Sequence, residues 1–416
     1  MGFRNGATME NIPDVLLPNI FIRLPAKQLA QMRCVTKSWN AILSQSSFIK
    51  SHLNRSIQSN NTDGILLAFP HFFSFASKPF TAHPSRSPHL EITDFIKLPL
   101  NPQSNIARGM VIGCVNGLIC FTYGSNHHSE YIRIWNPSLA EAICIWNPSL
   151  SALITLPPYY IPSHSIQQYL RFGYDPKTDD YKVVKVTRHI EKQADGITTA
   201  IKEWLPVEVY SMRTGSWKYL ITQKIPSYVS DLYDSDKLCV DGHEGHLHWV
   251  AEINRHWDAA PAILAFDLGA ETFREMELPD PVADSIFDNE DETSMDLAIL
   301  GGKLCVISKS LPDFEIEVWV MNEYGVEESW VKLDEFPPFS GNFHTYGFTS
   351  HSEFFVQIGE GGLGLYDPGE GKTKIFKFHG GSYTVGKVVE YVDSLVWVTP
   401  AEQREMRCCG ISRFHF

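Results

Sequence analysis

The tightest cluster of metal-ligand side chains in the sequence lies in the segment DGHEGHLHW, at residues 241–249. Its potential ligands, with one that follows shortly after, are Asp241, His243, Glu244, His246, His248 and His256. Histidines two residues apart on a strand point to one side, so His246 and His248 could share a metal ion. Closed zinc sites, however, usually take cysteine and histidine from separated pairs, and no cysteine pair accompanies these histidines. We therefore interpret the segment as a polar turn before a buried strand, and expect no metal and no cofactor.

Other patterns that could supply an enzyme's chemistry are also weak. The adjacent Cys408 and Cys409 do not have the Cys-x-x-Cys spacing. The sequence contains no Gly-x-Ser-x-Gly motif and no glycine-rich loop with a lysine that could hold a phosphate. The glycine-rich residues 359–364 lie between two expected strands and are interpreted as a tight turn. The sequence therefore indicates no catalytic residue.

The most specific pattern lies at residues 12–53, where three short amphipathic helices are expected. Apolar residues recur three or four apart in the first helix, at Leu16, Leu17, Ile20 and Leu24. Pro25 ends that helix, and Thr36 offers a side-chain oxygen to the start of the third. We expect the regular part of the first helix to start late, which places Pro18 in its first turn. A unit of roughly 40 residues rarely buries so much apolar surface alone, which indicates a partner surface.

The runs IFIRLP, AKQL, RCV, KSW and SFIKSHL in this segment resemble the F-box, in the form common in plant F-box proteins. The resemblance implies binding to a Skp-type adaptor and, through it, to cullin and RING subunits of a ubiquitin ligase. It implies that the adaptor-binding residues are Ile12, Pro13, Ile20, Leu24, Pro25, Leu29, Val35 and Trp39. Each of these side chains could instead pack inside the helix trio. Val15 departs from the family pattern, which usually has a second acidic residue there.

The charge of the chain differs between this head and the remainder. The 416 residues have 35 basic and 48 acidic side chains, a net charge of −13. Residues 1–59 contain seven basic and two acidic residues, so the head is +5 and the rest of the chain is −18. A basic head suits an acidic adaptor. An acidic body disfavours nucleic-acid binding, which depends on Lys and Arg contacts to phosphates.

The cysteines and the hydropathy indicate the compartment. The eight cysteines are scattered, mostly within apolar strand-like runs, as is typical of reduced and buried thiols. No run of 18 apolar residues and no charged-then-apolar leader is present. We therefore expect no membrane partner and a cytoplasmic and/or nuclear protein.

Beyond residue 60 the helical period gives way to short alternating segments closed by Gly, Asn-Pro or Asp-Pro. Five loosely similar units recur about every fifty to sixty residues, beginning with GLICFTYG and ending with EFFVQIGE and LGLYDPGE. The segments GILLAF near residue 64 and SLVWVTP near residue 394 are expected to complete a sixth unit across the two ends of the chain. Such radial repetition predicts a β-propeller of about six blades, with seven as the alternative.

The same units resemble the F-box-associated, kelch-like region of plant F-box proteins, through NGLICF, WNPS, FGYDPKTDDYKVV and VEVYSMRTGSWK. The aromatic residues at the turns of these units are interpreted as interior residues of the blades: Trp135, Tyr210, Phe266, Trp319 and Tyr366. The hexapeptide IWNPSL occurs twice, at residues 134–139 and 145–150. Both copies have the same alternation, so we predict that excision of residues 140–150 keeps the inward-facing side chains and changes the stability by no more than about 1 kcal/mol. The alternative is that the extra residues form one more strand.

Two further segments are candidates for target recognition. Residues 280–296 contain seven acidic side chains and could contact a basic peptide, although a solvated loop is the simpler interpretation. Residues 71–89 are rich in Phe, Ser and Pro, and the exposure of Phe72, Phe73, Phe75 and Phe80 would be costly.

Together these features predict a small all-α head followed by an all-β domain. The expected divisions are an F-box at residues 10–54, a linker at 55–63 and a β-propeller-like F-box-associated domain at 64–416. The expected function is substrate recognition for an SCF-type ubiquitin ligase, as a non-catalytic subunit that also binds a target protein. Two alternatives are a propeller hydrolase with an accessory helical head, and an F-box protein that acts outside ubiquitylation.

Overall fold

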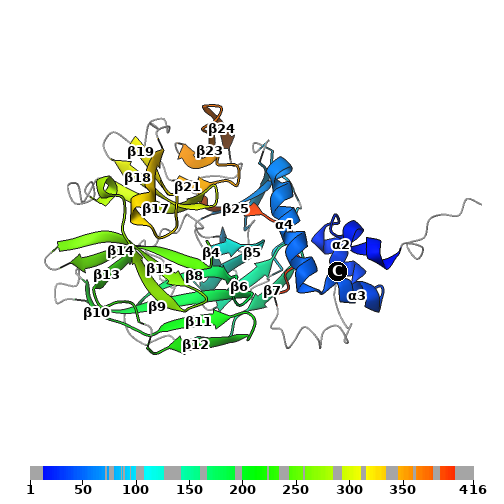
Figure 1. Cartoon of the computed structure of the whole chain (residues 1–416), viewed down its shortest axis with the longest axis horizontal. Helices are drawn as coiled ribbons and strands as arrows, with labels where there is room; N and C mark the ends of the chain where they lie inside the picture. Colours follow the sequence, from blue (N-terminus) through cyan, green and yellow to red (C-terminus); the bar gives the residue numbers. More distant parts are fainter. Residues whose placement is uncertain are drawn as a thin grey trace, which may run out of the picture.

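A small helical head, residues 13–63, lies at one side of a larger β-domain in this computed structural model (Figure 1). The structure describes residues 13–398 except 71–72, 75–78, 86, 88–89, 94, 100–106, 126–141, 160–165, 193–198, 223, 234–242, 256–257, 284–292, 311–314, 334–344, 359–361 and 378–384. The head comprises η2 (Asp14–Leu16), α1 (Leu17–Phe21), α2 (Ala26–Met32), α3 (Lys37–Leu43) and α4 (Ser46–Asp63). Within the described ranges, no helix has the length and hydropathy needed to cross a membrane.

The boundaries of the short helices follow from their prolines and one threonine. Pro18 occupies the first turn of α1, where its missing N–H leaves no hydrogen bond unmade, as expected from the sequence. Pro25 directly precedes α2. The Thr36 side chain accepts a hydrogen bond from the Trp39 backbone N–H at 3.1 Å and so caps α3. Residues 55–63, expected to be a linker, form the second half of α4, so the connection to the β-domain is helical.

Six antiparallel sheets make up the described part of the β-domain. The first joins the two ends of the domain and contains β25 (Val385–Tyr391), β1 (Ile65–Pro70) and β3 (Thr81–Pro84). The second contains β2 (Phe73–Ser74), β4 (Ala107–Val115), β5 (Leu118–Ser125), β6 (Ala142–Asn147) and β7 (Ala152–Thr155). The third contains β8 (Ile166–Asp175), β9 (Asp180–Lys192), β10 (Thr199–Trp204), β11 (Val207–Ser211) and β12 (Ser216–Leu220).

The remaining three sheets are four-stranded meanders. The fourth sheet contains β13 (Val229–Tyr233), β14 (His246–Arg255), β15 (Asp258–Asp267) and β16 (Thr272–Met276). The fifth contains β17 (Thr293–Leu300), β18 (Lys303–Ser310), β19 (Glu315–Met321) and β20 (Trp330–Leu333), with η4 (Glu327–Ser329) before its last strand. The sixth contains β21 (Thr345–Phe348), β22 (Phe354–Ile358), β23 (Gly362–Asp367) and β24 (Lys372–Lys377).

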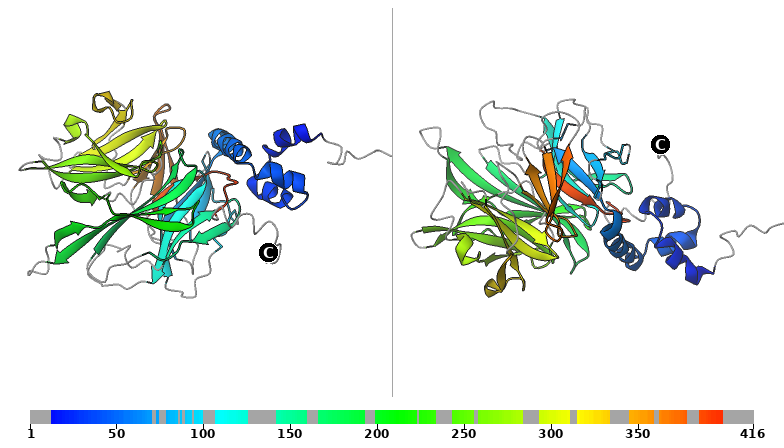
Figure 2. Two further views of the ribbon diagram at one scale, coloured as in Figure 1. Left: turned by 60° about the horizontal axis from the view of Figure 1, so that its bottom comes forward. Right: turned by 90° about the horizontal axis from the view of Figure 1, so that it is seen from above.

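The sheets are the blades of a six-bladed β-propeller, which confirms the expected architecture. Neighbouring blades contact one another through β4 and β8, β8 and β14, β14 and β17, and β17 and β21. Figure 1 shows the blades arranged around a centre, and both views of Figure 2 show the helical head beside them. Each blade buries both of its faces against its neighbours, and radial closure leaves few exposed sheet edges.

The ring closes by pairing of the two ends of the β-domain. β1 pairs antiparallel with β25, and Leu67 lies opposite Val389. GILLAF belongs to this blade, as predicted, but the predicted pairing of GILLAF with SLVWVTP is wrong. The partner strand is VGKVVEY, whereas residues 394–398 of SLVWVTP form no strand. These residues continue past the blade and lie against the head.

The interiors between blades contain large aromatic side chains, as the turn motifs predicted. Tyr210 and Phe266 are fully buried, Tyr366 is buried, and Trp319 is half-buried. Trp135 lies outside the described residues. Within the Phe-rich segment, Phe80 is buried and contacts Phe69 and Trp146. Nothing in the structure describes the side chains of Phe72, Phe73 and Phe75.

The second copy of the tandem hexapeptide forms part of the second blade. Ile145, Trp146 and Asn147 end β6, which pairs with β5 on one side and β7 on the other. Ile143, Cys144, Ile145 and Trp146 are all buried. The first copy, residues 134–139, lies outside the described residues.

Candidate functional site

The helical head has its own apolar interior, which takes one side chain from the far end of the chain. Leu17, Phe21, Leu29 and Leu43 are buried in it, together with Leu395. Trp39 packs edge-on against Phe21 with ring centroids 5.1 Å apart. The head therefore does not fold around its own residues alone.

The eight residues predicted to bind an adaptor divide into four groups in the structure. Pro13, Pro25 and Val35 are exposed, whereas Ile20, Leu24 and Trp39 are half-buried. Leu29 is fully buried in the interior of the head, so its side chain is not on the surface offered to a partner. Ile12 lies outside the described residues. Of the described residues in the predicted set, Val35 is the exposed large hydrophobic one, and 61% of its surface is accessible.

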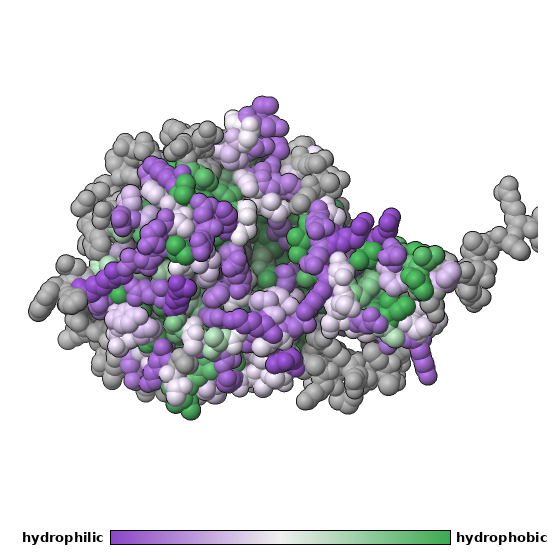
Figure 3. Space-filling model, in the orientation of Figure 1, coloured by the Kyte–Doolittle hydropathy of each residue, from purple (hydrophilic) through white to green (hydrophobic). Residues whose placement is uncertain are grey.

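Two neighbouring apolar residues on the head were not in the predicted set. Val15 is 83% exposed and Leu16 is 49% exposed, both in η2. Leu16 was part of the helical spacing of apolar residues, which indicated that its side chain faces the interior of the head. Helical periodicity alone does not show which apolar residues remain exposed. Figure 3 shows hydrophobic surface on the part of the head away from the β-domain. The head thus presents an apolar surface where a partner could bind.

Residues 392–398, which we call the strap, fix the head to the β-domain. The Asp393 carboxylate accepts a hydrogen bond from the Ala26 backbone N–H at 2.8 Å. Leu395 packs inside the head, and the Arg33 guanidinium lies 4.7 Å from the centre of the Trp397 ring. A buried apolar contact, a helix-terminal hydrogen bond and a cation–π contact therefore join the head to the strap.

The β-domain holds the strap from its other side. The Asn147 side-chain amide donates to the backbone carbonyls of Ser394 at 3.0 Å and Val396 at 2.7 Å. The Ser394 backbone N–H donates to Ser149 Oγ at 3.0 Å. Val396 packs in the core between the second and third blades. Asn147, in the second copy of the tandem hexapeptide, therefore anchors the strap, which positions the head.

A second, weaker link runs from α4 to the third blade. Lys50 Nζ lies 3.1 Å from Asp179 Oδ2 in the β8–β9 turn, and both side chains are about half exposed. An exposed ion pair of this kind contributes little stability because water and salt screen it. Ile49 also packs against the core of the second and third blades. The apolar contact and the strap therefore carry most of the attachment.

The histidine cluster forms a packed group with a tyrosine. His248 is fully buried, and its Nε2 lies 2.7 Å from the Tyr324 hydroxyl. The His246 ring centre lies 4.9 Å from that of Tyr324, and burial lowers the pKa of His243. Asp241 and His256 lie outside the described residues, and the described part of the chain has no group of three or more side chains suited to a metal. The cluster joins the fourth and fifth blades.

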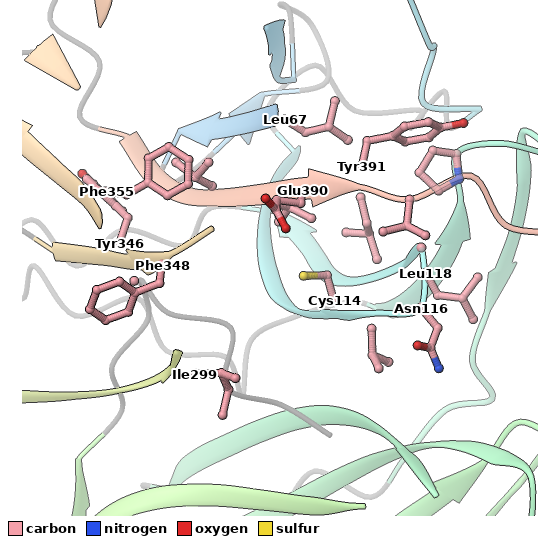
Figure 4. Close-up of a pocket in the computed structure, with 18 of the residues that line it drawn as sticks. Leu67, Cys114, Asn116, Leu118, Ile299, Tyr346, Phe348, Phe355, Glu390 and Tyr391 are labelled. Atoms are coloured by element: carbon pink, nitrogen blue, oxygen red, sulfur yellow. The ribbon is translucent and has the colours of Figure 1, made fainter. Parts of the chain in front are cut away.

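A cavity of about 230 Å³ opens among four blades, next to the strap. Figure 4 shows Tyr346, Phe348 and Phe355 on one side and Asn116 and Leu118 on the other. Glu390 and Cys114 lie between these two walls, and Ile299 lies across from them. Tyr391, which precedes the strap, and Val392, the first residue of the strap, also line the cavity.

The comparisons with known proteins agree with this architecture. Residues 9–51 match the F-box domain, and residues 70–358 match the F-box associated beta propeller domain. The chain therefore belongs to the F-box-associated β-propeller family and has an N-terminal F-box. The resemblance that the sequence motifs indicated is confirmed.

Similar proteins occur in Arabidopsis thaliana. The chain is 29% identical over 336 residues to F-box protein CPR1, an alignment that covers 78% of this chain and 73% of the relative. It is 26% identical over 337 residues to F-box protein At4g22390, which covers 79% and 75%. A chain of a nidogen/laminin complex is 12% identical with a TM-score of 0.41, over 80% of this chain and 99% of that one.

Proposed function

We propose that this chain is the substrate-recognition subunit of an SCF-type E3 ubiquitin ligase. The F-box would bind a Skp-type adaptor and, through it, the cullin and RING subunits, while the propeller binds a target protein. The observation that carries the proposal is that the head exposes the apolar residues Val15, Leu16 and Val35 while the strap fixes the head to the propeller. A subunit of this kind is non-catalytic and acts by raising the effective concentration of its target near the ligase.

The target is expected at the end of the propeller away from the head. The turns that carry Gly117, Ser149 and Asp179 contact the strap or α4, so they mark the occupied end. Because successive strands are antiparallel, β16 ends and β17 begins at the opposite end. Most of the acidic segment 280–296 falls between these two strands, which favours a target with a basic surface.

A reducing compartment suits this role. Among the described residues, Cys34, Cys144 and Cys305 are free thiols. Burial raises the pKa of the Cys144 thiol to about 11, which keeps it protonated and unreactive. We therefore propose a cytoplasmic and/or nuclear location.

The adaptor proposal is tested by pull-down of a recombinant Skp-type adaptor with the full chain. A Leu16→Asp, Val35→Asp double variant should lose binding, because each charge is placed on exposed apolar surface without entering the core. The matched control is Ile221→Asp, on the propeller, where the residue is 74% exposed. It should bind like the wild type. Binding by the double variant, or none by the wild type, would overturn the proposal.

A further inference from the structure

The cavity beside the strap contains a carboxylic acid in mainly apolar surroundings. Glu390 is on β25, in the closing blade, and is half-buried. Its two oxygens accept hydrogen bonds from the Ser350 backbone N–H at 3.1 and 3.2 Å, and the Ser350 hydroxyl donates at 3.2 Å. Burial raises the pKa of the Glu390 carboxyl, although these hydrogen bonds oppose the shift. The Ser350 donors thus hold the carboxyl in place without neutralising its charge.

The cavity walls offer no basic side chain to this acid. None of the described residues that line the cavity is Lys, Arg or His. His351, which follows Ser350 and is not part of the cavity lining, lowers the pKa of the Glu390 carboxyl through its charge, and this effect is smaller than those of burial and of the Ser350 hydrogen bonds. Lys387 is on the same strand, but it is three residues away and its Nζ donates to the Ile112 carbonyl at 2.8 Å. A carboxylate in an apolar site is stabilised by a cation that carries a hydrocarbon group, because the charge pairs with the carboxylate and the hydrocarbon packs against the apolar walls.

The aromatic residues complete a site for such a cation. Tyr346, Phe348 and Phe355 form one wall of the cavity (Figure 4). The face of an aromatic ring attracts an ammonium group, and the attraction increases where water is excluded. The volume of about 230 Å³ is below the roughly 300–1,000 Å³ of sites for drug-sized ligands, so the occupant is small.

We propose that this cavity binds an alkylammonium group, with Glu390 as its counter-ion and the aromatic wall against its hydrocarbon. The group could belong to a small free amine or to a lysine side chain of a protein. This site is independent of the proposed adaptor surface on the head. It is also separate from the far end of the propeller, where the target is expected.

The test is isothermal titration calorimetry on the full chain with 2-phenylethylammonium chloride and n-butylammonium chloride. Saturable binding is expected for at least one of these amines, and much weaker binding for the neutral isosteres 2-phenylethanol and 1-butanol. Glu390→Gln should weaken amine binding at least tenfold. The matched control Glu370→Gln should not, because Glu370 is exposed in the β23–β24 turn, away from the cavity. Equal binding of amine and alcohol, or equal binding by Glu390→Gln and wild type, would overturn the proposal.

A second variant keeps the test decisive if Glu390→Gln folds poorly. Ile299→Phe enlarges a half-buried wall residue and should abolish amine binding by filling the cavity, while Glu390 remains. Its fold is checked by thermal melting.

Nα-acetyl-lysine methylamide, used as a third probe, distinguishes a lysine side chain from a small free amine as the source of the alkylammonium group. Glu390-dependent binding of this probe, tighter than that of the free amines, assigns the site to a lysine side chain, whereas tighter binding of the free amines assigns it to a small amine. No saturable binding of any of the three probes contradicts the proposal.

Discussion

The Asp393 carboxylate supplies the first turn of α2 with a hydrogen-bond acceptor from 367 residues further along the chain. A helix usually obtains this acceptor from its own N-cap residue, but Pro25 occupies that position here and makes no side-chain cap. The negative charge also suits the partial positive charge at a helix N-terminus. The stability of the F-box therefore depends on a residue of the strap, which no local reading of the F-box sequence could reveal.

Replacement of Asp393 tests this link. We expect Asp393→Ala to lower the free energy of unfolding by about 1 kcal/mol, in the range found for lost N-cap acceptors. Asp393→Asn should retain most of the stability because its amide oxygen can still accept from the Ala26 N–H. Native-state hydrogen exchange at that amide is the direct measurement. Unchanged exchange in Asp393→Ala would show that the hydrogen bond contributes nothing to the attachment of the head.

The β6 strand shows how a repeated sequence acquires a single structural role. Both IWNPSL copies predict the same strand and turn, and the residues within them cannot distinguish one from the other. The preceding residues differ, because the second copy follows Cys144 and the first follows Arg133. Cys144 is fully buried, and its Sγ lies 3.4 Å from Thr155 Oγ1. A guanidinium could not occupy that position without an unpaired buried charge.

Two deletions of eleven residues each test whether the two IWNPSL copies are interchangeable. Removal of residues 140–150 would place Arg133 at the position of Cys144, so we expect a loss of more than about 2 kcal/mol or insoluble protein. Removal of residues 129–139 keeps β6 and its buried residues, and should leave the melting temperature within a few degrees of the wild type. The earlier expectation that the first deletion is neutral considered parity alone. Equal stability of the two deletion variants would restore that expectation.

Sequence periodicity predicted whether a segment is a helix or a strand, whereas contacts between residues distant in the sequence determined where several of these segments lie. The alternation of GILLAF and the spacing around Leu17 were enough for a strand and a helix. SLVWVTP alternates as a strand does, yet Asn147 satisfies its carbonyls and Leu395 enters the head. Leu29 and Val35 are equally apolar in sequence, but only Leu29 is covered. The cavity was also missed, because Glu390 and Ser350 lie 40 residues apart and meet only when the ring closes.

At the scale of the whole molecule, closure of the ring and attachment of the head depend on one continuous segment. β25 completes the first blade, and the strap follows it directly. Val389 belongs to the core shared with the second blade, and Val388 to the core shared with the sixth. Any change that displaces β25 therefore disturbs two blade interfaces, the cavity and the position of the F-box together.

Truncation before β25 tests this dependence. A chain that ends at Thr384 lacks the six paired positions with β1 and the two buried valines. Each buried valine contributes about 1.5–3 kcal/mol, so the loss approaches the roughly 5–15 kcal/mol that stabilises a whole domain. We expect the β-domain to lose its cooperative thermal transition. A chain that ends at Val398 is the control because it keeps every described contact. If the Thr384 truncation melted like this control, the ring would not need β25, and the unpaired edge of β1 would have to be stable in water.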